Sequence, residues 1–127
     1  MNILLDTHTV LWLAGNSPEL SNAAKHAIFD ADRKKYVCIA SAWEIAIKIS
    51  SGKMRLVGGT AEFLNIIGIN GFSILPVKPE YLMLVESLPF HHRDPFGRLF
   101  IAAAMSEKLA IVTADARMSA YNVPCVW

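Results

Sequence analysis

Short apolar runs alternate along the chain with longer stretches whose apolar residues recur at helical spacing. The apolar runs, each typical of a buried strand, cover 2–5, 36–40, 72–77, 110–113 and 124–127. The stretches between them predict helices over 7–14, 21–32, 41–51, 60–67, 79–88, 95–108 and 115–120. Buried strands that alternate with helices are typical of a parallel sheet covered on both faces. The pattern therefore predicts an α/β fold, a three-layer α/β/α sandwich around a parallel sheet of four to five strands.

Several polar residues suit the ends of these helices. Gly15 follows the helix over 7–14 and fits the left-handed conformation that often ends a helix. Ser41-x-x-Glu44 has the spacing of a capping box, and Asp94 stands where an N-cap is expected. Capping is thus a structural explanation that competes with a functional one for Glu44 and Asp94.

Length and composition indicate one domain, 1–127, with more apolar residues than its core is expected to bury. A chain of 127 residues can bury about two-thirds of its unfolded surface. Its hydrophobic fraction is 54%, and values of about 45–50% are typical even when Gly is counted. We therefore expect part of the surface to meet a partner protein. Cys38 and Cys125 each lie in an apolar run and are expected to be buried thiols.

No segment indicates a membrane protein. None of the apolar runs approaches the roughly 18 residues needed to span a bilayer, and the first residues lack a signal-peptide layout. We therefore expect a cytoplasmic protein. The net charge of +1 gives no general basic surface for nucleic acid, so any contact with nucleic acid would be local.

Four acidic residues stand at the carboxyl ends of predicted strands or at the start of a helix. They are Asp6 after strand 2–5, Glu44 after strand 36–40, Asp115 after strand 110–113, and Asp94 before helix 95–108. Each alone is an ordinary helix cap, but parallel strands meet at one edge, where ligands collect. Carboxylates gathered there repel one another unless a cation neutralises them. The arrangement therefore predicts a site for Mg²⁺ or Mn²⁺, which prefer carboxylate oxygens.

A metal site beside helix N-termini suits phosphodiester chemistry. A bound metal can activate water and stabilise a leaving oxygen, and helix N-termini favour phosphate. Lys48, Arg93 and Arg98 are candidates for phosphate contacts, with surface ion pairs as the equal alternative. Thr7 and Thr113 are further candidates for contact with substrate.

The histidines give little support for other chemistry. His8 and His26 lie on predicted helices. His91 and His92 lie in an irregular segment before Asp94, where loop structure is the first interpretation and contact with substrate phosphate the second.

Two other classes that gather acids at a sheet edge fit poorly. A phosphoacceptor receiver domain needs an acidic pair after its first strand and a lysine ending a late strand, where this chain has Asp6 alone and Thr113. A haloacid-dehalogenase-type phosphatase needs Asp-x-Asp, and this chain has Asp6-Thr7-His8.

Four segments together resemble the motifs of a known family. They are Leu4-Leu5-Asp6-Thr7-His8, Ser41-Ala42-Trp43-Glu44-Ile45-Ala46-Ile47-Lys48, His92-Arg93-Asp94-Pro95-Phe96-Gly97-Arg98-Leu99 and Val112-Thr113-Ala114-Asp115. In this order they resemble PIN domains, and more narrowly the VapC-type toxin branch, over nearly the whole chain. The resemblance implies a Mg²⁺- or Mn²⁺-dependent endoribonuclease, the toxin of a type II toxin–antitoxin pair. It also implies a homodimer that a cognate antitoxin silences by inserting a segment near the active site.

The resemblance implies metal-binding and catalytic roles for Asp6, Glu44, Asp94 and Asp115, but the third motif departs from the family at one position. Relatives usually have Asp-Pro-Phe-Asp-Arg there, and the second aspartate is replaced by Gly97. Glycine in a first helical turn costs up to about 1 kcal/mol relative to alanine and offers no carboxylate. One hypothesis is an attenuated or inactivated nuclease, and the second is an active enzyme in which Asp94 supplies the acid. A third is a PIN-fold module without catalysis that binds an antitoxin.

Overall fold

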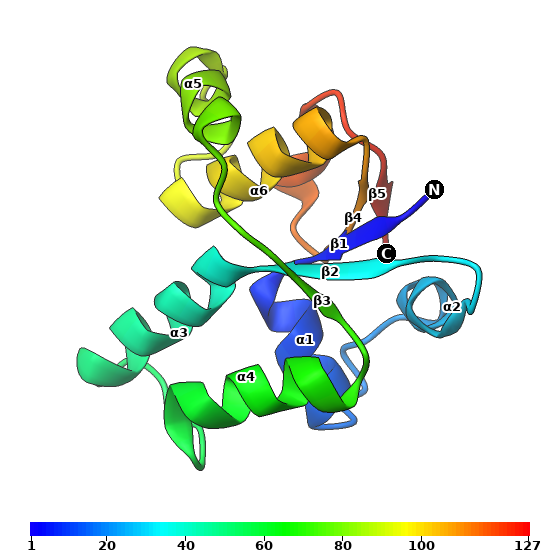
Figure 1. Ribbon diagram of the computed structural model, residues 1–127, viewed down its shortest axis with the longest axis vertical. Helices are drawn as coiled ribbons and strands as arrows, with labels where there is room; N and C mark the ends of the chain where they lie inside the picture. The colour runs from blue at the N-terminus through cyan, green and yellow to red at the C-terminus, as the bar shows by residue number, and fades with distance from the viewer.

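A five-stranded parallel sheet forms the centre of the computed structural model, which describes residues 1–127 (Figure 1). Its strands are β1 (Ile3–Leu5), β2 (Lys35–Cys38), β3 (Ser73–Leu75), β4 (Ala110–Val112) and β5 (Cys125–Val126). They lie in the order β3-β2-β1-β4-β5, and every neighbouring pair is parallel. The predicted parallel α/β sheet is confirmed.

The central strand β1 brings distant parts of the chain to one edge of the sheet. Leu5 is paired with Val37 of β2 on one side and with Val112 of β4 on the other. All three residues of β1 are fully buried, as expected for a strand covered on both faces. The segments that follow β1, β2 and β4 therefore begin side by side.

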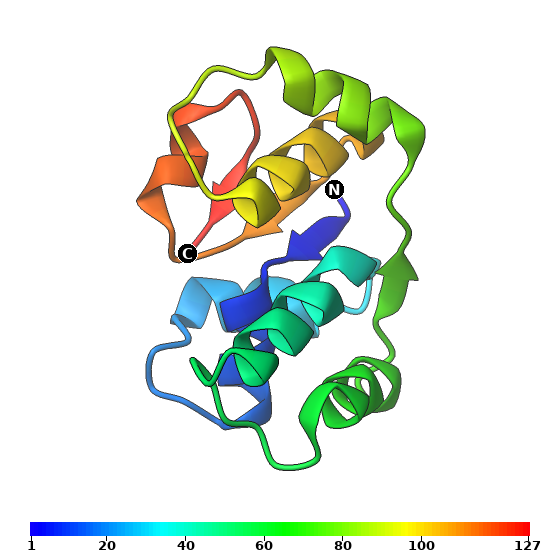
Figure 2. The ribbon, with the colours of Figure 1, turned by 90° about the vertical axis from the view of Figure 1, so that its left-hand side faces the viewer.

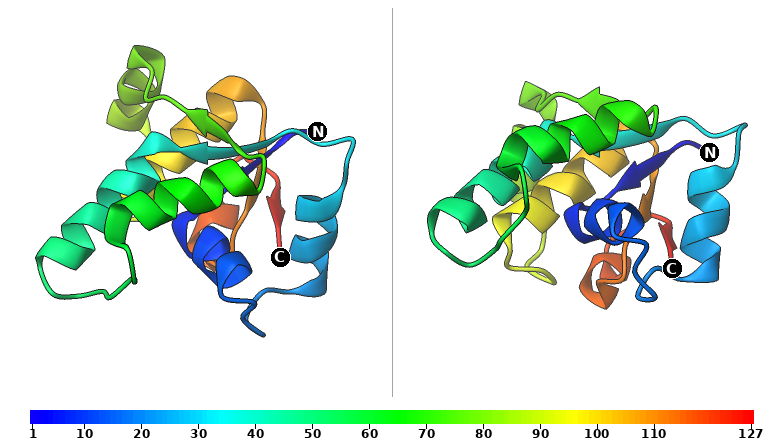
Figure 3. Two further views of the ribbon diagram at one scale, coloured as in Figure 1. Left: turned by 60° about the horizontal axis from the view of Figure 1, so that its bottom comes forward. Right: turned by 90° about the horizontal axis from the view of Figure 1, so that it is seen from below.

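Helices cover both faces of the sheet, as Figure 2 shows. They are α1 (Thr7–Ala14), α2 (Asn22–Phe29), α3 (Ile39–Ser50), α4 (Gly59–Ile69), α5 (Pro79–Ser87), α6 (Pro95–Glu107) and the 3₁₀ helix η1 (Ala116–Ala120). Apolar residues of α1 to α4 pack on one face of the sheet, and those of α5, α6 and η1 pack on the other. Figure 3 shows α1 against α4, and α2 beside β5. The three predicted layers are confirmed.

Three helix ends differ from the prediction. Helix α3 begins at Ile39, so Ser41 lies inside its first turn and the predicted capping box does not form. Helix α2 ends at Phe29 and not near residue 32. Gly15 has a φ of −85°, and the left-handed residue at this turn is the following Asn16, with a φ of 49°.

No helix is both long enough and apolar enough to cross a membrane. The two cysteines are free thiols, with Cys38 buried and Cys125 half-buried. Burial raises the pKa of both thiols.

Candidate active site

All four predicted acids line one pocket of about 450 Å³ at the carboxyl edge of the sheet. Asp6 follows β1, Glu44 comes from α3 after β2, Asp115 follows β4, and Asp94 precedes α6. They converge because β2, β1 and β4 are neighbours in the sheet. Lys48 and Arg117 also line the pocket, so two cations stand among the carboxylates.

Asp6 is fixed by backbone and side-chain donors. It is the N-cap of α1, and its Oδ1 accepts a hydrogen bond of 2.9 Å from the backbone N–H of Thr9. The hydroxyl of Thr113 donates to its other carboxylate oxygen. Thr113 is buried and also accepts from the backbone N–H of Asp115 at 3.1 Å. Thr113 therefore links two of the acids and has no free hydroxyl proton for a substrate.

Glu44 is buried in the second turn of α3 with two partners. The hydroxyl of Thr7 donates to its Oε1 at 2.6 Å, and the ammonium of Lys48 lies 2.9 Å from its Oε2. Ser41 is fully buried, with its hydroxyl 3.0 Å from that of Thr7. Because the capping box is absent, the Glu44 side chain is not held at the helix N-terminus and can point toward the pocket. The i, i+4 ion pair between Glu44 and Lys48 is confirmed.

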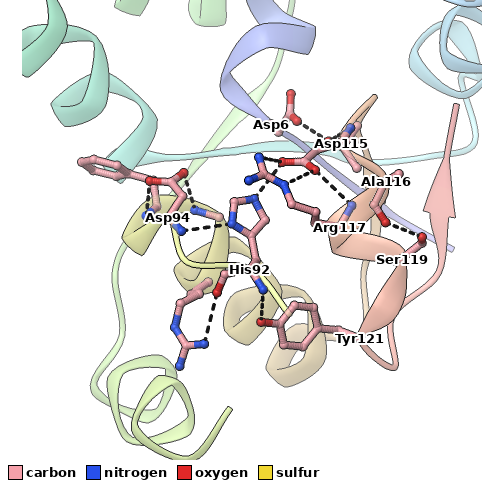
Figure 4. A network of polar contacts seen from close by, with 12 residues as sticks. Asp6, His92, Asp94, Asp115, Ala116, Arg117, Ser119 and Tyr121 are labelled. Atoms are coloured by element: carbon pink, nitrogen blue, oxygen red, sulfur yellow. Dashed lines mark hydrogen bonds and ion pairs between the residues drawn. The ribbon is translucent and has the colours of Figure 1, made fainter. Parts of the chain in front are cut away.

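Asp115 is bound by Arg117 and His92. The Arg117 guanidinium donates to it twice, from Nε to Oδ1 at 3.0 Å and from Nη2 to Oδ2 at 2.9 Å, and the Arg117 backbone N–H donates to Oδ1 at 3.0 Å. His92 adds a contact of 2.7 Å between its Nε2 and Oδ2 of Asp115 (Figure 4). The Arg117 guanidinium, with smaller contributions from the Arg117 N–H and His92, lowers the pKa of Asp115 to about 2.

Asp94 caps α6, as the structural interpretation predicted. Its carboxylate accepts hydrogen bonds from the backbone N–H groups of Phe96 at 3.4 Å and Gly97 at 3.1 Å. The same carboxylate lines the pocket. Capping and a position in the pocket are therefore compatible for this residue.

His92 occupies the space next to Gly97. A Cβ atom built at Gly97 would lie only 2.9 Å from Nε2 of His92, and 3.1 Å from its Cε1. The imidazole is 2% exposed and is held on both sides, since the backbone N–H of Asp94 donates to its Nδ1 at 3.0 Å. An Nδ1 that accepts carries no proton, so the neutral ring has its proton on Nε2 and donates it to Asp115.

The other candidates for phosphate contact fall in different places. Arg98 does not line the pocket: it is buried, and its guanidinium donates to the carbonyls of Val85, Leu88, Pro89 and His92. The prediction of a phosphate contact by Arg98 is therefore wrong, because its donors are used to hold the segment between α5 and α6. Arg93 is exposed and outside the pocket, while Thr7 and Lys48 line it.

The carboxylates gather as predicted but do not form a metal centre in this arrangement. No group of three or more His, Cys, Asp or Glu side chains is placed to hold a metal ion. Each acid is instead paired with protein donors, and the His92 ring lies directly beside Gly97. Oxygen donors of the right kind are present, but these residues do not fit Mg²⁺ or Mn²⁺ as they stand.

Sequence reasoning missed the parts that hold the acids in place. Thr9, His92 and Arg117 orient Asp6 and Asp115, and none was assigned that role. Arg117 was detectable, since it lies two residues after Asp115 in the first turn of a short helix. His92 was not, because its approach depends on the fold of the segment before α6.

Residues 3–124 match the PIN domain family, and this chain belongs to that family. Within the family it is of the VapC type: it is 30% identical to Ribonuclease VapC22 of Mycobacterium tuberculosis, over 96% of this chain and 93% of that protein. The fold is similar to the crystal structure of VapBC2 from Rickettsia felis bound to a promoter DNA fragment, with a TM-score of 0.74, 13% identity, and coverage of 98% and 97%. It is also similar to a toxin–antitoxin complex from Klebsiella pneumoniae, with a TM-score of 0.68, 15% identity, and coverage of 99% and 97%.

Proposed function

We propose that this chain is the toxin component of a toxin–antitoxin pair, an endoribonuclease that hydrolyses RNA and is attenuated at position 97. The observation that carries the proposal is the pocket in which Asp6, Glu44 and Asp115 meet from three adjacent strand ends. VapC-type family membership supports the activity on RNA, because the 30% identical relative is named a ribonuclease.

The charges of the pocket suit a polyanionic substrate. Lys48 and Arg117 stand at its wall, and Arg117 is largely exposed beyond its bonds to Asp115. Phosphate oxygens of RNA could replace the carboxylates as partners of these two cations. We therefore propose Lys48 and Arg117 as the residues that receive the RNA backbone, with Thr7 beside them.

The proposal includes Mg²⁺ or Mn²⁺ as cofactor, with Asp6, Glu44, Asp94 and Asp115 as the proposed catalytic and metal-binding acids. These residues line one pocket, but no three of them are placed to hold a metal ion together, so we derive no catalytic step from a bound metal. Attenuation by Gly97 is consistent with that geometry, since the residue contributes no carboxylate to the pocket.

Exposed apolar side chains support a protein partner. Ile39, Trp43 and Ile47 follow one another at intervals of four along α3 and are 39%, 64% and 40% exposed. Phe96 contacts Trp43 with ring centroids 5.4 Å apart, so the stripe reaches the start of α6 beside the pocket. Such a surface suits a cognate antitoxin or a second copy of the chain, and we include both in the proposal. The proposal also includes a cytoplasmic location.

The proposal is tested by RNA cleavage with matched variants. Cleavage of a total small-RNA pool in Mn²⁺ is compared for the chain itself, for Gly97→Asp, and for Gly97→Asp with His92→Ala, each with and without Asp6→Asn. We expect cleavage in a Gly97→Asp background that Asp6→Asn abolishes, which separates it from a contaminating nuclease. Cleavage by the unmodified chain that Asp6→Asn removes would mean that Asp94 suffices.

A non-catalytic PIN-fold module is the second candidate, favoured by the absence of a formed metal centre. It predicts no cleavage by any of the six proteins in any divalent metal. Binding of a partner to α3 would then be the activity to measure, and Trp43→Ala would weaken that binding while leaving the pocket intact.

A further inference from the structure

Two aromatic side chains of α1 line the same pocket as the acids. His8 and Trp12 are four residues apart on this helix, so their rings are neighbours on one of its faces. Helical side chains lean toward the N-terminus of their helix, and the N-cap of α1 is Asp6. The Trp12 ring therefore leans toward the acidic end of the pocket.

His8 and Trp12 are the two rings of the pocket that a ligand can reach. The other rings of its lining, Phe100 and His92, are buried, with 3% and 2% of their surface exposed. His8 is exposed and Trp12 is half-buried. The indole N–H of Trp12 has no partner within the chain, and since no buried side-chain N or O atom is left unpaired, this group is open to solvent. The indole thus offers an apolar ring and a free donor.

Trp12 is held in place by packing. Its ring contacts that of Trp127, with centroids 5.5 Å apart and the planes at 53°, and the side chain packs against the core beneath α1. The His8 ring contacts the same indole at 5.6 Å and 42°. Because both neighbouring rings are tilted, neither covers the indole as a flat stacked partner would. The ring is fixed in position and still accessible.

We propose that Trp12, together with His8, forms a base-stacking subsite that receives one nucleobase of the RNA. The pocket of about 450 Å³ lies within the range of roughly 300–1,000 Å³ for sites that hold small ligands, which suits a single nucleotide. Lys48 and Arg117 of the same pocket are placed to take phosphate, and every base has a ring face that an aromatic side chain can stack on. The inference rests on the proposed function for its ligand, RNA, and not on cleavage.

The subsite requires an unpaired nucleotide. A base inside a duplex is stacked on both faces and cannot reach the indole unless it leaves the helix. Single-stranded RNA is therefore the simplest probe, and it separates contacts to bases from contacts to phosphate.

The experiment compares two anions in EDTA, where no metal-dependent cleavage occurs. Calorimetry gives the dissociation constants of a short oligouridylate and of inorganic polyphosphate, which has similar charge and no bases. Trp12→Leu should weaken oligouridylate binding by about tenfold and polyphosphate binding by less than about twofold. Lys48→Gln should weaken both. Equal loss for the two anions in Trp12→Leu, or no loss for oligouridylate, would overturn the subsite.

Further variants separate stacking from folding, because Trp12 also packs against the core. Trp12→Phe keeps an aromatic ring and should retain oligouridylate affinity within about threefold. His8→Ala changes an exposed residue and should weaken oligouridylate binding by about threefold at an unchanged melting temperature. Phe29→Leu is the control, since Phe29 is an aromatic residue of α2 that is 67% exposed and outside this pocket, and it should leave both anions unaffected.

Stacking and cleavage can fail separately. If Asp6→Asn abolishes RNA cleavage while oligouridylate binding is indifferent to Trp12 and His8, the nuclease proposal stands and the subsite is refuted. If binding depends on the bases as expected while no variant cleaves RNA, the subsite stands and the nuclease proposal fails. A chain that binds polyphosphate and oligouridylate equally well would also refute the subsite.

Discussion

The hydroxyl of Thr7 donates to the carboxylate of Glu44 at 2.6 Å, which joins the first turn of α1 to the second turn of α3. The two residues are 37 positions apart in the chain and both are buried. A short hydrogen bond to a buried carboxylate is worth more than one between neutral groups, since the carboxylate has left water. Thr7 thus has a structural role alongside its place in the pocket.

Thr7→Val should destabilise the protein, because it keeps the shape of the side chain and removes the donor to Glu44. We expect a loss of about 1–3 kcal/mol in the free energy of unfolding, measured by urea denaturation. Thr60→Val is the matched control, since Thr60 lies in α4 without a side-chain hydrogen bond, and it should change stability by less than about 0.5 kcal/mol. Equal effects of the two changes would show that the Thr7 hydroxyl contributes nothing.

Arg117→Gln should raise the pKa of Asp115 from about 2 toward its ordinary value of 3.8. A carboxyl whose pKa is lowered by folding stabilises the protein above its unfolded pKa, and that contribution is lost as the pH falls through the folded value. The unmodified chain should therefore exceed the variant in stability at pH 5, and the difference should shrink toward pH 2.

NMR titration of the Asp115 carboxyl carbon checks the shift directly, and unfolding at the two pH values checks its consequence. Arg33→Gln is the control, because Arg33 pairs with Asp30 on the opposite end of the molecule from the pocket residues. A titration of Asp115 unchanged by Arg117→Gln would refute the assigned cause.

Arg98→Ala should be costly, since it leaves buried backbone carbonyls of the segment between α5 and α6 without their donor. We expect a loss of about 3 kcal/mol, seen as a lower urea midpoint. Arg93→Ala removes the same charge from an exposed position and should cost less than about 0.5 kcal/mol. If Arg98 instead contacted phosphate, its loss would spare stability and reduce RNA binding.

Tyr81→Phe tests a cluster remote from the pocket. The Tyr81 hydroxyl donates to Glu107 at 2.5 Å, and this bond is the main cause that lowers the pKa of Glu107, ahead of Lys78. The change should cost about 1 kcal/mol of stability and raise the Glu107 pKa in an NMR titration. Tyr36→Phe is the control, because the Tyr36 hydroxyl has no hydrogen bond in the structure. It should change neither the stability nor the Glu107 pKa, and Mn²⁺ binding should be unchanged in both variants.

The order of strands and helices followed from hydrophobic periodicity, because a buried parallel sheet leaves a strong apolar signal in each strand. Gathering of Asp6, Glu44 and Asp115 at one edge followed from the same topology. The first residue of a helix was harder to predict. Helix α3 begins at Ile39, directly after β2, and no side chain caps its N-terminus. Side-chain partners were hardest, since the approach of His92 to Asp115 spans 23 positions and depends on the path of an irregular segment.

The role of Arg98 is a second case in which side-chain partners could not be predicted from the sequence. Arg98 is a basic residue close to the acidic motif at Asp94, so the local sequence alone favours a contact with substrate phosphate. Its guanidinium instead satisfies carbonyls of a segment that has no regular hydrogen-bond partners of its own. Only the three-dimensional path of residues 85–92 distinguishes the two roles.

The position of β1 between β2 and β4 also determines how much of the chain must be synthesised before the pocket can form. The Thr113 hydroxyl reaches Asp6 across 107 positions of the chain, and β1 has no neighbour on that side until β4 has been made. Such distant pairings form late, because the intervening polypeptide must first be closed into a loop. A chain still emerging from the ribosome can pair β1 with β2 but cannot yet bring Asp115 to Asp6 and Glu44, so the complete pocket is assembled only once synthesis has passed residue 115.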